Sequence, residues 1–342
     1  MTKVLVTGGS RFNGLAVVEE LVRTGYEVAT FNRGVTPVVL PRGVRQIHGD
    51  RHDHEAMRTL FANESFDAII DTSAYNKDDV DGILDIYKGR VGHYIFISSC
   101  ASYAPSLASP IHEDRTPFNF DPSERNNYGR NKAIVETFLI DEHRTWGAPY
   151  STAKLPTVMG PRNNAKQREQ LMFHRLLQGR PVLIPGNGST LSHPSYVMDQ
   201  AKAICSMLFN PRTYGQGYNM GMQEYYSDDY WVNTIGAIVG VQPEKIYMPH
   251  EVADEVYAPG AFPYQIVQRH GVGLVPWYKN SLFDIRKLAQ HTGYRQEHTM
   301  EGALAETYEW FCREGLDRTF EWDFSFEDTL LERVKAMPGT RH

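Results

Sequence analysis

The sequence predicts an α/β protein: a Rossmann-type, doubly wound parallel sheet with a smaller, mixed C-terminal lobe. Short apolar segments alternate with segments whose apolar residues recur at helical spacing, the pattern of a parallel sheet covered by helices. The first apolar segment runs into a glycine-rich turn, and this turn runs into the first helix. A strand, a glycine turn and a helix in that order open a dinucleotide-binding fold.

The elements follow from local patterns, taken in chain order. The apolar run Val4–Val6 predicts a buried strand, the apolar residues between Leu15 and Val22 recur at helical spacing, and Gly25 ends that helix. Further apolar runs predict strands at 28–31, 44–48, 67–71, 93–98, 150–158 and 218–220. Helical spacing predicts helices at 54–61, 79–87, 128–143 and 197–208.

The pattern changes in two places. Residues 102–127 are rich in Pro, Ser, Asn and Asp, which predicts a long loop over the site. Beyond residue 160 the alternation loosens, and helices are expected at 231–239, 281–292 and 300–314. We therefore expect a dinucleotide-binding domain of residues 1–160 plus 192–222 and a substrate-binding lobe of residues 161–191 plus 223–342.

Composition narrows the class of protein. The 342 residues suffice for two packed lobes, and a formal net charge of -6 argues against a general nucleic-acid binder. The three cysteines lie far apart, which fits a reducing compartment and predicts no metal site. No apolar run approaches a membrane span, and the N-terminus leads directly into the first strand. We expect a cytoplasmic protein, with a homodimer as a base-rate expectation.

The glycine turn is the predicted pyrophosphate site, because glycines let the backbone approach the phosphates and the helix N-terminus presents free N–H groups. Asn32 lies eighteen residues past Gly14, where an acidic residue would bind the ribose hydroxyls of NAD. Arg33 follows it, and Arg11 lies in the turn, so two cations and no carboxylate favour the 2′-phosphate of NADP. The alternative is that both arginines are solvated surface residues.

The remaining predicted cofactor contacts follow later strands. Asp50, after the third strand, is placed to accept a hydrogen bond from the adenine amino group, and the loop after the fourth strand faces the cofactor. The full set of predicted cofactor-binding residues is Gly8, Gly9, Ser10, Arg11, Phe12, Asn13, Gly14, Asn32, Arg33, Asp50, Arg51, Ser73, Ala74, Lys132 and Pro156.

Three residues form the predicted catalytic group. Tyr128 and Lys132 lie four residues apart and share one face of the predicted helix, so the ammonium can stabilise the phenolate. A phenol with a lowered pKa can exchange protons near neutral pH. Ser99 ends the fifth strand and can hydrogen-bond the same substrate oxygen. The alternative for the Tyr–Lys pair is an ordinary surface helix.

These motifs together resemble the extended short-chain dehydrogenase/reductase superfamily, and more closely its NAD(P)-dependent nucleotide-sugar epimerase/dehydratase branch. The resemblance rests on Thr7–Gly14, Ser98-Ser99, Tyr128-x-x-x-Lys132 and Gly160-Pro161, and it continues through most of the chain. The glycine turn is closest to an atypical group that includes chloroplast stem-loop RNA-binding proteins. The resemblance implies a Ser99, Tyr128 and Lys132 triad, with Lys132 bonding the nicotinamide ribose and the C-terminal lobe holding substrate.

The chain also departs from the family pattern. Cys100-Ala101 follow Ser99 where sugar 4,6-dehydratases carry Asp-Glu, which disfavours dehydration. Leu191 lies where an arginine often contacts the substrate diphosphate, so another cation such as Arg162 is needed there. The predicted substrate-binding residues are Tyr75, Cys100, Arg162, Asn163 and His193.

Three functions remain open from the sequence. The first is an epimerase of a sugar or nucleotide-sugar carbinol, which passes through a transient ketone and retains its cofactor. The second is an NADP(H)-dependent carbonyl reductase or dehydrogenase that uses the same residues and exchanges its cofactor. The third is an RNA-binding protein on a short-chain dehydrogenase fold, against which the acidic charge balance counts.

Overall fold

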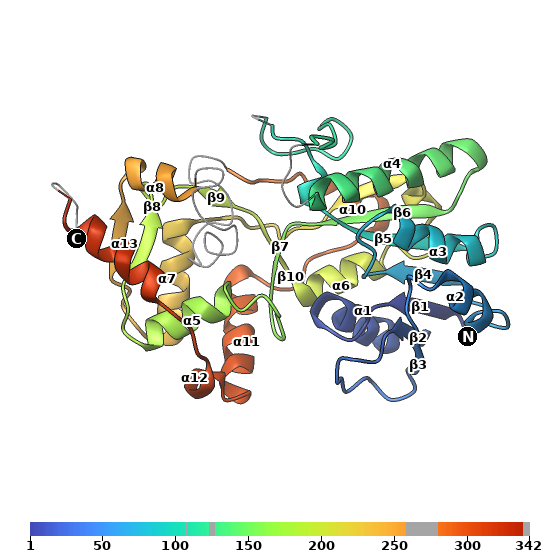
Figure 1. Ribbon diagram of the computed structural model, residues 1–342, viewed down its shortest axis with the longest axis horizontal. Helices are drawn as coiled ribbons and strands as arrows, with labels where there is room; N and C mark the ends of the chain where they lie inside the picture. Colours follow the sequence, from blue (N-terminus) through green and yellow to red (C-terminus); the bar gives the residue numbers. More distant parts are fainter. Residues whose placement is uncertain (107, 123–126, 258–279, 338–342) are drawn as a thin grey trace. The chain divides into compact units, whose positions relative to one another are not determined.

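The protein is described by a computed structural model that covers residues 1–106, 108–122, 127–257 and 280–337. The chain divides into two units (Figure 1). The first comprises Met1–Val158, Ser195–Gly221 and Phe283–Glu297, and the second comprises Met159–Pro194, Met222–Leu282 and His298–His342.

The first unit is built on a seven-stranded parallel sheet in the order β11-β6-β5-β4-β1-β2-β3. Its strands are β1 (Lys3–Thr7), β2 (Glu27–Asn32), β3 (Arg45–His48), β4 (Ala68–Asp71), β5 (His93–Ser99), β6 (Tyr150–Leu155) and β11 (Gln216–Asn219). The strand order reverses between β1 and β4, so the carboxyl ends of these two strands flank the crevice in which such sheets bind ligands. The Rossmann-type sheet predicted from the sequence is confirmed.

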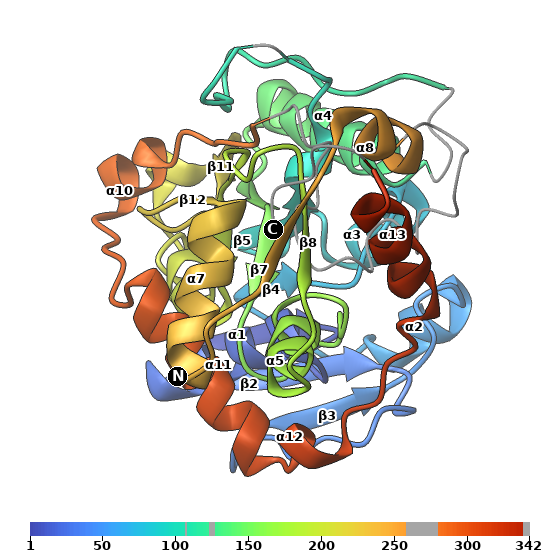
Figure 2. The same ribbon diagram turned by 90° about the vertical axis from the view of Figure 1, so that its left-hand side faces the viewer.

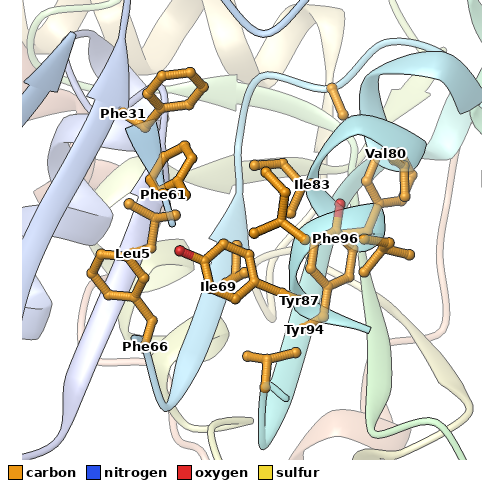
Figure 3. Close-up of a cluster of buried hydrophobic side chains, with 14 of the residues drawn as sticks. Leu5, Phe31, Phe61, Phe66, Ile69, Val80, Ile83, Tyr87, Tyr94 and Phe96 are labelled. Carbon is orange, nitrogen blue, oxygen red and sulfur yellow. The ribbon is translucent and has the colours of Figure 1, made fainter. Parts of the chain in front are cut away.

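Helices cover both faces of this sheet. On one face, α2 (His54–Leu60), α3 (Lys77–Tyr87) and α4 (Tyr128–Trp146) pack on the strands through a single apolar cluster (Figure 3). Leu5, Ile69 and Phe96 enter this cluster from β1, β4 and β5. On the other face, α1 (Phe12–Arg23) packs on β1, β2 and α6 (Val197–Cys205). Close packing of the helices on both faces of the sheet fixes the positions of the strand ends, where the predicted site residues lie.

The second unit packs α5 (Glu169–Leu177), α7 (Asp228–Val239), α11 (Met300–Arg313) and α12 (Leu316–Thr319) together (Figure 2). A parallel pair, β8 (Val182–Pro185) and β13 (Lys245–Met248), is covered by α8 (His250–Tyr257) and α13 (Ser325–Lys335) through an apolar cluster. Two short pairs complete the described strands: β9 (Leu191–Ser192) with β12 (Tyr226–Ser227), and β7 (Thr157–Met159) with β10 (Pro194–Tyr196).

Several predicted boundaries shift for identifiable reasons. The strand expected over 150–158 is two strands, because Pro156 has no N–H to continue the ladder. Helix α7 begins three residues early, since the Ser227 hydroxyl accepts a hydrogen bond from the Tyr230 N–H and caps it. Helix α10 (Arg286–Thr292) is shorter than the expected 281–292. The elements α5, β8, β13, α8 and α13 were not expected.

The two units differ from the predicted lobes in one whole segment and by one to three residues at the other boundaries. Residues 283–297 were assigned to the substrate lobe, whereas they cluster with the first unit. His291 carries this attachment, because its Nδ1 lies 2.7 Å from the Tyr218 hydroxyl and its carbonyl accepts a hydrogen bond from Asn210 at 2.9 Å. The separate roles expected for the two units remain predictions.

Asp228, the first residue of α7, is a buried carboxyl group in the second unit. It is 1% exposed, and among the residues that the structure describes neither of its side-chain oxygens finds a hydrogen-bond partner. Burial, and to a lesser degree the charge of Asp229, raises the pKa of Asp228 to about 7. A carboxyl whose pKa rises on folding destabilises the folded state as the pH increases from the unfolded value toward the folded one.

We therefore expect Asp228→Asn to stabilise the protein increasingly between pH 4 and pH 7, with a gain of about 4 kcal/mol at most. Below pH 4 the carboxyl is protonated in both the folded and unfolded states and contributes nothing to the difference. Urea unfolding at several pH values measures the effect. Asp229→Asn is the control, because Asp229 accepts hydrogen bonds from Tyr247 and Lys245 and its loss should destabilise. A pH-independent effect of Asp228→Asn would contradict the prediction.

Candidate functional site

The glycine turn between β1 and α1 is shaped for close approach of a ligand. Gly8 and Gly9 have φ values of 91° and 78°, which L side chains rarely adopt. A Cβ on Gly14 would lie 2.7 Å from the Gly9 nitrogen, so only glycine lets the helix start this close to the turn. Helix α1 has no side-chain cap and no acidic residue in its first turn, so the electropositive N-terminus is suited to a phosphate.

The ribose end of the predicted cofactor site carries no carboxylate on β2. The Asn32 side chain donates to the Gly8 carbonyl at 3.1 Å and accepts from the Gly34 N–H at 2.8 Å, so it ties the end of β2 to the glycine turn. Arg11 and Arg33 are both exposed. Ser10, Phe12 and Asn13 complete the turn, and the Asn13 amide oxygen accepts from Gln200 of α6 at 3.3 Å.

Asp71, at the end of β4, is the centre of a buried polar network. Arg51 donates to its two carboxylate oxygens at 3.1 and 2.9 Å, and the Tyr94 hydroxyl donates at 2.9 Å. The Thr7 hydroxyl and the backbone N–H groups of residues 73 and 74 also donate to Oδ1. These partners, Arg51 foremost, outweigh the effect of burial and hold the pKa of Asp71 at about 2. Sequence reasoning missed this residue.

Arg51, a predicted cofactor contact, hydrogen-bonds the protein through both terminal nitrogens of its guanidinium, and its Nε lies 3.3 Å from Asp79 Oδ1. Its guanidinium also donates to the Ser73 hydroxyl at 2.7 Å and to the Asp79 carbonyl at 2.6 Å. Its side chain is 11% exposed. The side chain therefore links the end of β3 to the loop after β4, and any cofactor contact of Arg51 would come from its backbone. Asp50 beside it is exposed and caps the turn by accepting from the His52 N–H at 3.0 Å.

The loop after β4 also holds the side chain of Lys132. The Lys132 ammonium donates to the Ala74 carbonyl at 2.6 Å and to the Ile97 carbonyl of β5 at 2.8 Å. Burial lowers the pKa of Lys132 to about 8, although the charges of Asp71 and Glu136 oppose this shift. The structure thus places the ammonium, still mainly charged at neutral pH, between two strand ends.

Three aromatic rings lie next to this ammonium, and the centroid of the Phe96 ring on β5 is 4.6 Å from the Lys132 nitrogen. The Lys132 nitrogen is 5.8 Å from the centroid of the Tyr128 ring and 5.4 Å from that of Tyr75. The rings of Tyr75 and Tyr128 are 6.2 Å apart, and Tyr75 is 61% exposed. The structure therefore brings together Tyr128 and Lys132, the predicted catalytic pair, and Tyr75, a predicted substrate contact whose phenol is at the surface.

Ser99 lies at the last position of β5. Its hydroxyl accepts a hydrogen bond from the Ala101 N–H at 3.2 Å and lies 3.4 Å from the carbonyl of Leu155. Leu155 is followed by Pro156, a predicted cofactor contact. The short turn Cys100–Ser102 that follows packs against α4, the helix of Tyr128. Burial raises the pKa of the Cys100 thiol well above its ordinary value. The Cys100 thiol is therefore neutral near pH 7 and unsuited to act as a base.

The other predicted substrate residues belong to the second unit. The Asn163 side chain donates to Glu169 at 2.9 Å, and its carbonyl accepts from Gln170, so it holds the loop after β7 in place. Arg162 in this loop has a φ of 65°. His193 is buried, its Nε2 lies 2.5 Å from the Met222 carbonyl, and burial lowers its pKa.

The described residues lack two features. In the part of the chain that the structure describes, no group of three or more His, Cys, Asp or Glu side chains could hold a metal ion. Within the same residues, no helix is long and apolar enough to cross a membrane.

A sequence model of the NAD dependent epimerase/dehydratase family matches residues 4–221, which include the whole glycine turn, Ser99 and the Tyr–Lys pair. The chain belongs to this family. The resemblance to extended short-chain dehydrogenases/reductases is thereby confirmed, and this member of the epimerase/dehydratase family is an NAD(P)-dependent enzyme.

The proteins that resemble this epimerase/dehydratase family member carry the names of different functions. It is 26% identical to the chloroplast stem-loop binding protein of 41 kDa b of Arabidopsis thaliana over 97% of this chain and 84% of that protein. It is 26% identical to the 2′-dehydrokanamycin reductase of Streptomyces kanamyceticus over 62% of this chain and 60% of that protein. The structure of UDP-glucose 4-epimerase of Thermotoga maritima with UDP-glucose aligns with a TM-score of 0.73 and 22% identity, covering 92% of this chain and 100% of that one. This last likeness concerns the fold.

Proposed function

We propose that the chain is an NAD(P)-dependent epimerase that inverts a carbinol centre of a sugar or nucleotide sugar through a transient ketone. The observation that carries this proposal is the Lys132 ammonium, held by the Ala74 and Ile97 carbonyls within 5.8 Å of the Tyr128 ring centroid. A positive charge at this distance favours the phenolate of Tyr128 over the phenol. Tyr128 can then serve as both base and acid near neutral pH.

The glycine turn fits a dinucleotide, because a Cβ at Gly8 would collide with Thr72 and one at Gly14 with Gly9, so only glycines allow the tight turn that leads into the uncapped N-terminus of α1. Such an N-terminus favours a pyrophosphate. When bound, the nicotinamide supplies the hydride acceptor and donor. Gly8–Gly14, Asn32, Ser73 and Ala74 would hold the cofactor, and Lys132 would bond its ribose. These assignments extend the family membership to individual residues.

The chain's own residues move the protons. Tyr128 takes the proton of the substrate hydroxyl as the carbon is oxidised, and the Ser99 hydroxyl donates a hydrogen bond to the same oxygen. After the ketone has turned in the site, Tyr128 returns its proton to the oxygen as the carbon is reduced from the other face. No proton or electron is gained overall, so an epimerase needs no external reductant.

A nucleotide sugar is the proposed substrate class. The solved epimerase from Thermotoga maritima holds UDP-glucose, and the present chain shares its fold. We assign substrate contacts to Tyr75, Cys100, Arg162, Asn163 and His193. Dehydration is disfavoured, because the neutral Cys100 thiol and Ala101 offer no acid–base pair beside Ser99. A cytoplasmic location and a homodimer remain predictions.

We further propose NADP as the cofactor in preference to NAD. At the carboxyl end of β2 stands Asn32, whose side chain bonds Gly8 and Gly34, so no carboxylate at this end of the strand would repel a 2′-phosphate. Two exposed arginines supply positive charge here: Arg11 in the glycine turn and Arg33 directly after β2.

Tyr128→Phe should lower kcat about 10²- to 10⁴-fold, because the acid–base group is lost while the ring remains. Turnover of a panel of nucleotide sugars deuterated at the reacting carbon measures the effect. An epimerase keeps the label on the inverted carbon without consuming NADPH, whereas a carbonyl reductase consumes one NADPH per product. Tyr26→Phe is the control, because Tyr26 directly precedes β2 and so lies at the amino ends of the strands, away from the proposed site at their carboxyl ends. Normal turnover by Tyr128→Phe would refute the mechanism.

Arg33→Ala should weaken NADP binding about 10-fold or more, since a charge-assisted hydrogen bond contributes about 1.5–3 kcal/mol. NAD binding should change less than about twofold, because NAD lacks the phosphate. Calorimetric titration with both cofactors compares the two losses, and Arg23→Ala, at the far end of α1, is the matched control. Equal losses for NADP and NAD would remove the case for a 2′-phosphate contact.

RNA binding is the second candidate function, favoured by the similarity to the chloroplast stem-loop binding protein. Phosphate contacts would make the affinity for RNA fall steeply with salt concentration. The net charge of -6 leads us to expect no such binding. Filter binding of a structured RNA at several salt concentrations tests this, and tight, strongly salt-dependent binding would contradict the expectation.

A further inference from the structure

A second buried ion pair lies beneath the carboxyl edge of the sheet. The Lys154 ammonium of β6 is 2.7 Å from Oε2 of Glu136 on α4, and the two side chains are 2% and 1% exposed. Removing two charges from water is costly, and such a pair is tolerated only where its remaining hydrogen-bonding capacity is used. The contacts of Glu136 and Lys154 therefore show what this pair holds together.

Glu136 connects the two elements that carry the predicted catalytic groups. Its other oxygen, Oε1, accepts a hydrogen bond from the Ser98 hydroxyl at 2.6 Å, and Ser98 directly precedes Ser99 on β5. On α4, Glu136 follows Lys132 by one turn and Tyr128 by two, so the three share a helix face. The carboxylate thus fixes the end of β5 against the helix that carries the acid–base tyrosine.

Lys154 connects the same carboxylate to the segment after Ser99. Its nitrogen lies 4.3 Å from the centroid of the Tyr103 ring and 4.5 Å from that of Phe118, which are cation–π distances. Tyr103 and Phe118 face each other in an antiparallel bridge. The lysine has room because position 217 on β11 is glycine: a Cβ there would lie 2.9 Å from the Lys154 Cε.

We propose that Lys154 and Glu136 form a positioning pair that sets Ser99 against Tyr128 and holds the Tyr103–Phe118 bridge at the same edge. The inference rests on the proposed function, because it assumes the roles of Ser99 and Tyr128. Neither residue of the pair touches the reacting atoms. Their effect on the reaction comes through the geometry of the groups that do.

Lys154→Met should lower kcat about 10- to 100-fold, the usual cost of a small misplacement of catalytic groups. The dissociation constant of the cofactor should change less than about twofold, because the glycine turn is not linked to this pair. Lys154→Arg should recover part of the kcat. The double variant Lys154→Met/Glu136→Leu should regain stability, since no unpaired charge stays buried, while its kcat stays low.

Arg175→Met is the matched control. Arg175 forms a buried ion pair with Glu327 in the second unit, at 2.6 Å, and has no part in the proposed chemistry. It should lower the melting temperature and leave kcat unchanged. If a folded Lys154→Met behaves the same way, the pair is only structural and the proposal is overturned. If Lys154→Met does not fold, Ser98→Ala decides: a kcat about 3- to 10-fold lower supports positioning, and an unchanged kcat overturns it.

Hydrogen exchange separates this inference from the proposed function, because it needs no turnover. In Lys154→Met, peptides containing Tyr103, Phe118 or the first turn of α4 should exchange faster than in the parent. Faster exchange together with a fully active Tyr128→Phe would show that the proposed function fails while the pair still holds these segments. Unchanged exchange would overturn the pair's role, whatever the activity of Tyr128→Phe.

Discussion

The first unit depends on one fully buried carboxylate, that of Asp71. A buried charge must be paired and hydrogen-bonded. The partners of Asp71 come from β1, from β5, from the loop after β3 and from the loop after β4, the strand that Asp71 ends. Satisfying this carboxylate fixes the loop after β4, and the same loop supplies the Ala74 carbonyl that holds the Lys132 ammonium. The electrostatics of the candidate site therefore begin with a residue whose side chain is fully buried.

Two buried ion pairs flank Lys132 and divide the work between them. Arg51 and Asp71 order the loop after β4 at the strand-order reversal, which is the proposed cofactor side, whereas Lys154 and Glu136 join β5, β6 and α4 on the proposed substrate side. Lys132 between them has carbonyl partners but no carboxylate in contact, so burial lowers its pKa while the neighbouring carboxylates keep it mainly charged. An ammonium that is held but not neutralised can act on the Tyr128 phenol.

Much of this could be predicted from the sequence, because it rests on local signals. The glycine turn, the alternating strands and helices, and the Tyr128–Lys132 spacing each follow from a few neighbouring residues. The partners of Asp71 and Glu136 could not, since Arg51 and Lys154 reach them only through tertiary packing. The available signal for the second pair was Lys154, a lysine within the otherwise uncharged segment 150–159. In the second unit, helices α7 and α11 were predicted, but the short β8–β13 pair was not, because it joins segments about sixty residues apart.

Mass spectrometry of the nucleotide released on denaturing the freshly purified protein bears most directly on the central claim, a dinucleotide held at the glycine turn and kept through turnover. We predict close to one equivalent of NADP per chain. One equivalent of NAD would keep the retained redox cycle and reject the 2′-phosphate contact. A protein that releases no nucleotide and binds neither added NADP nor added NAD would contradict the claim itself.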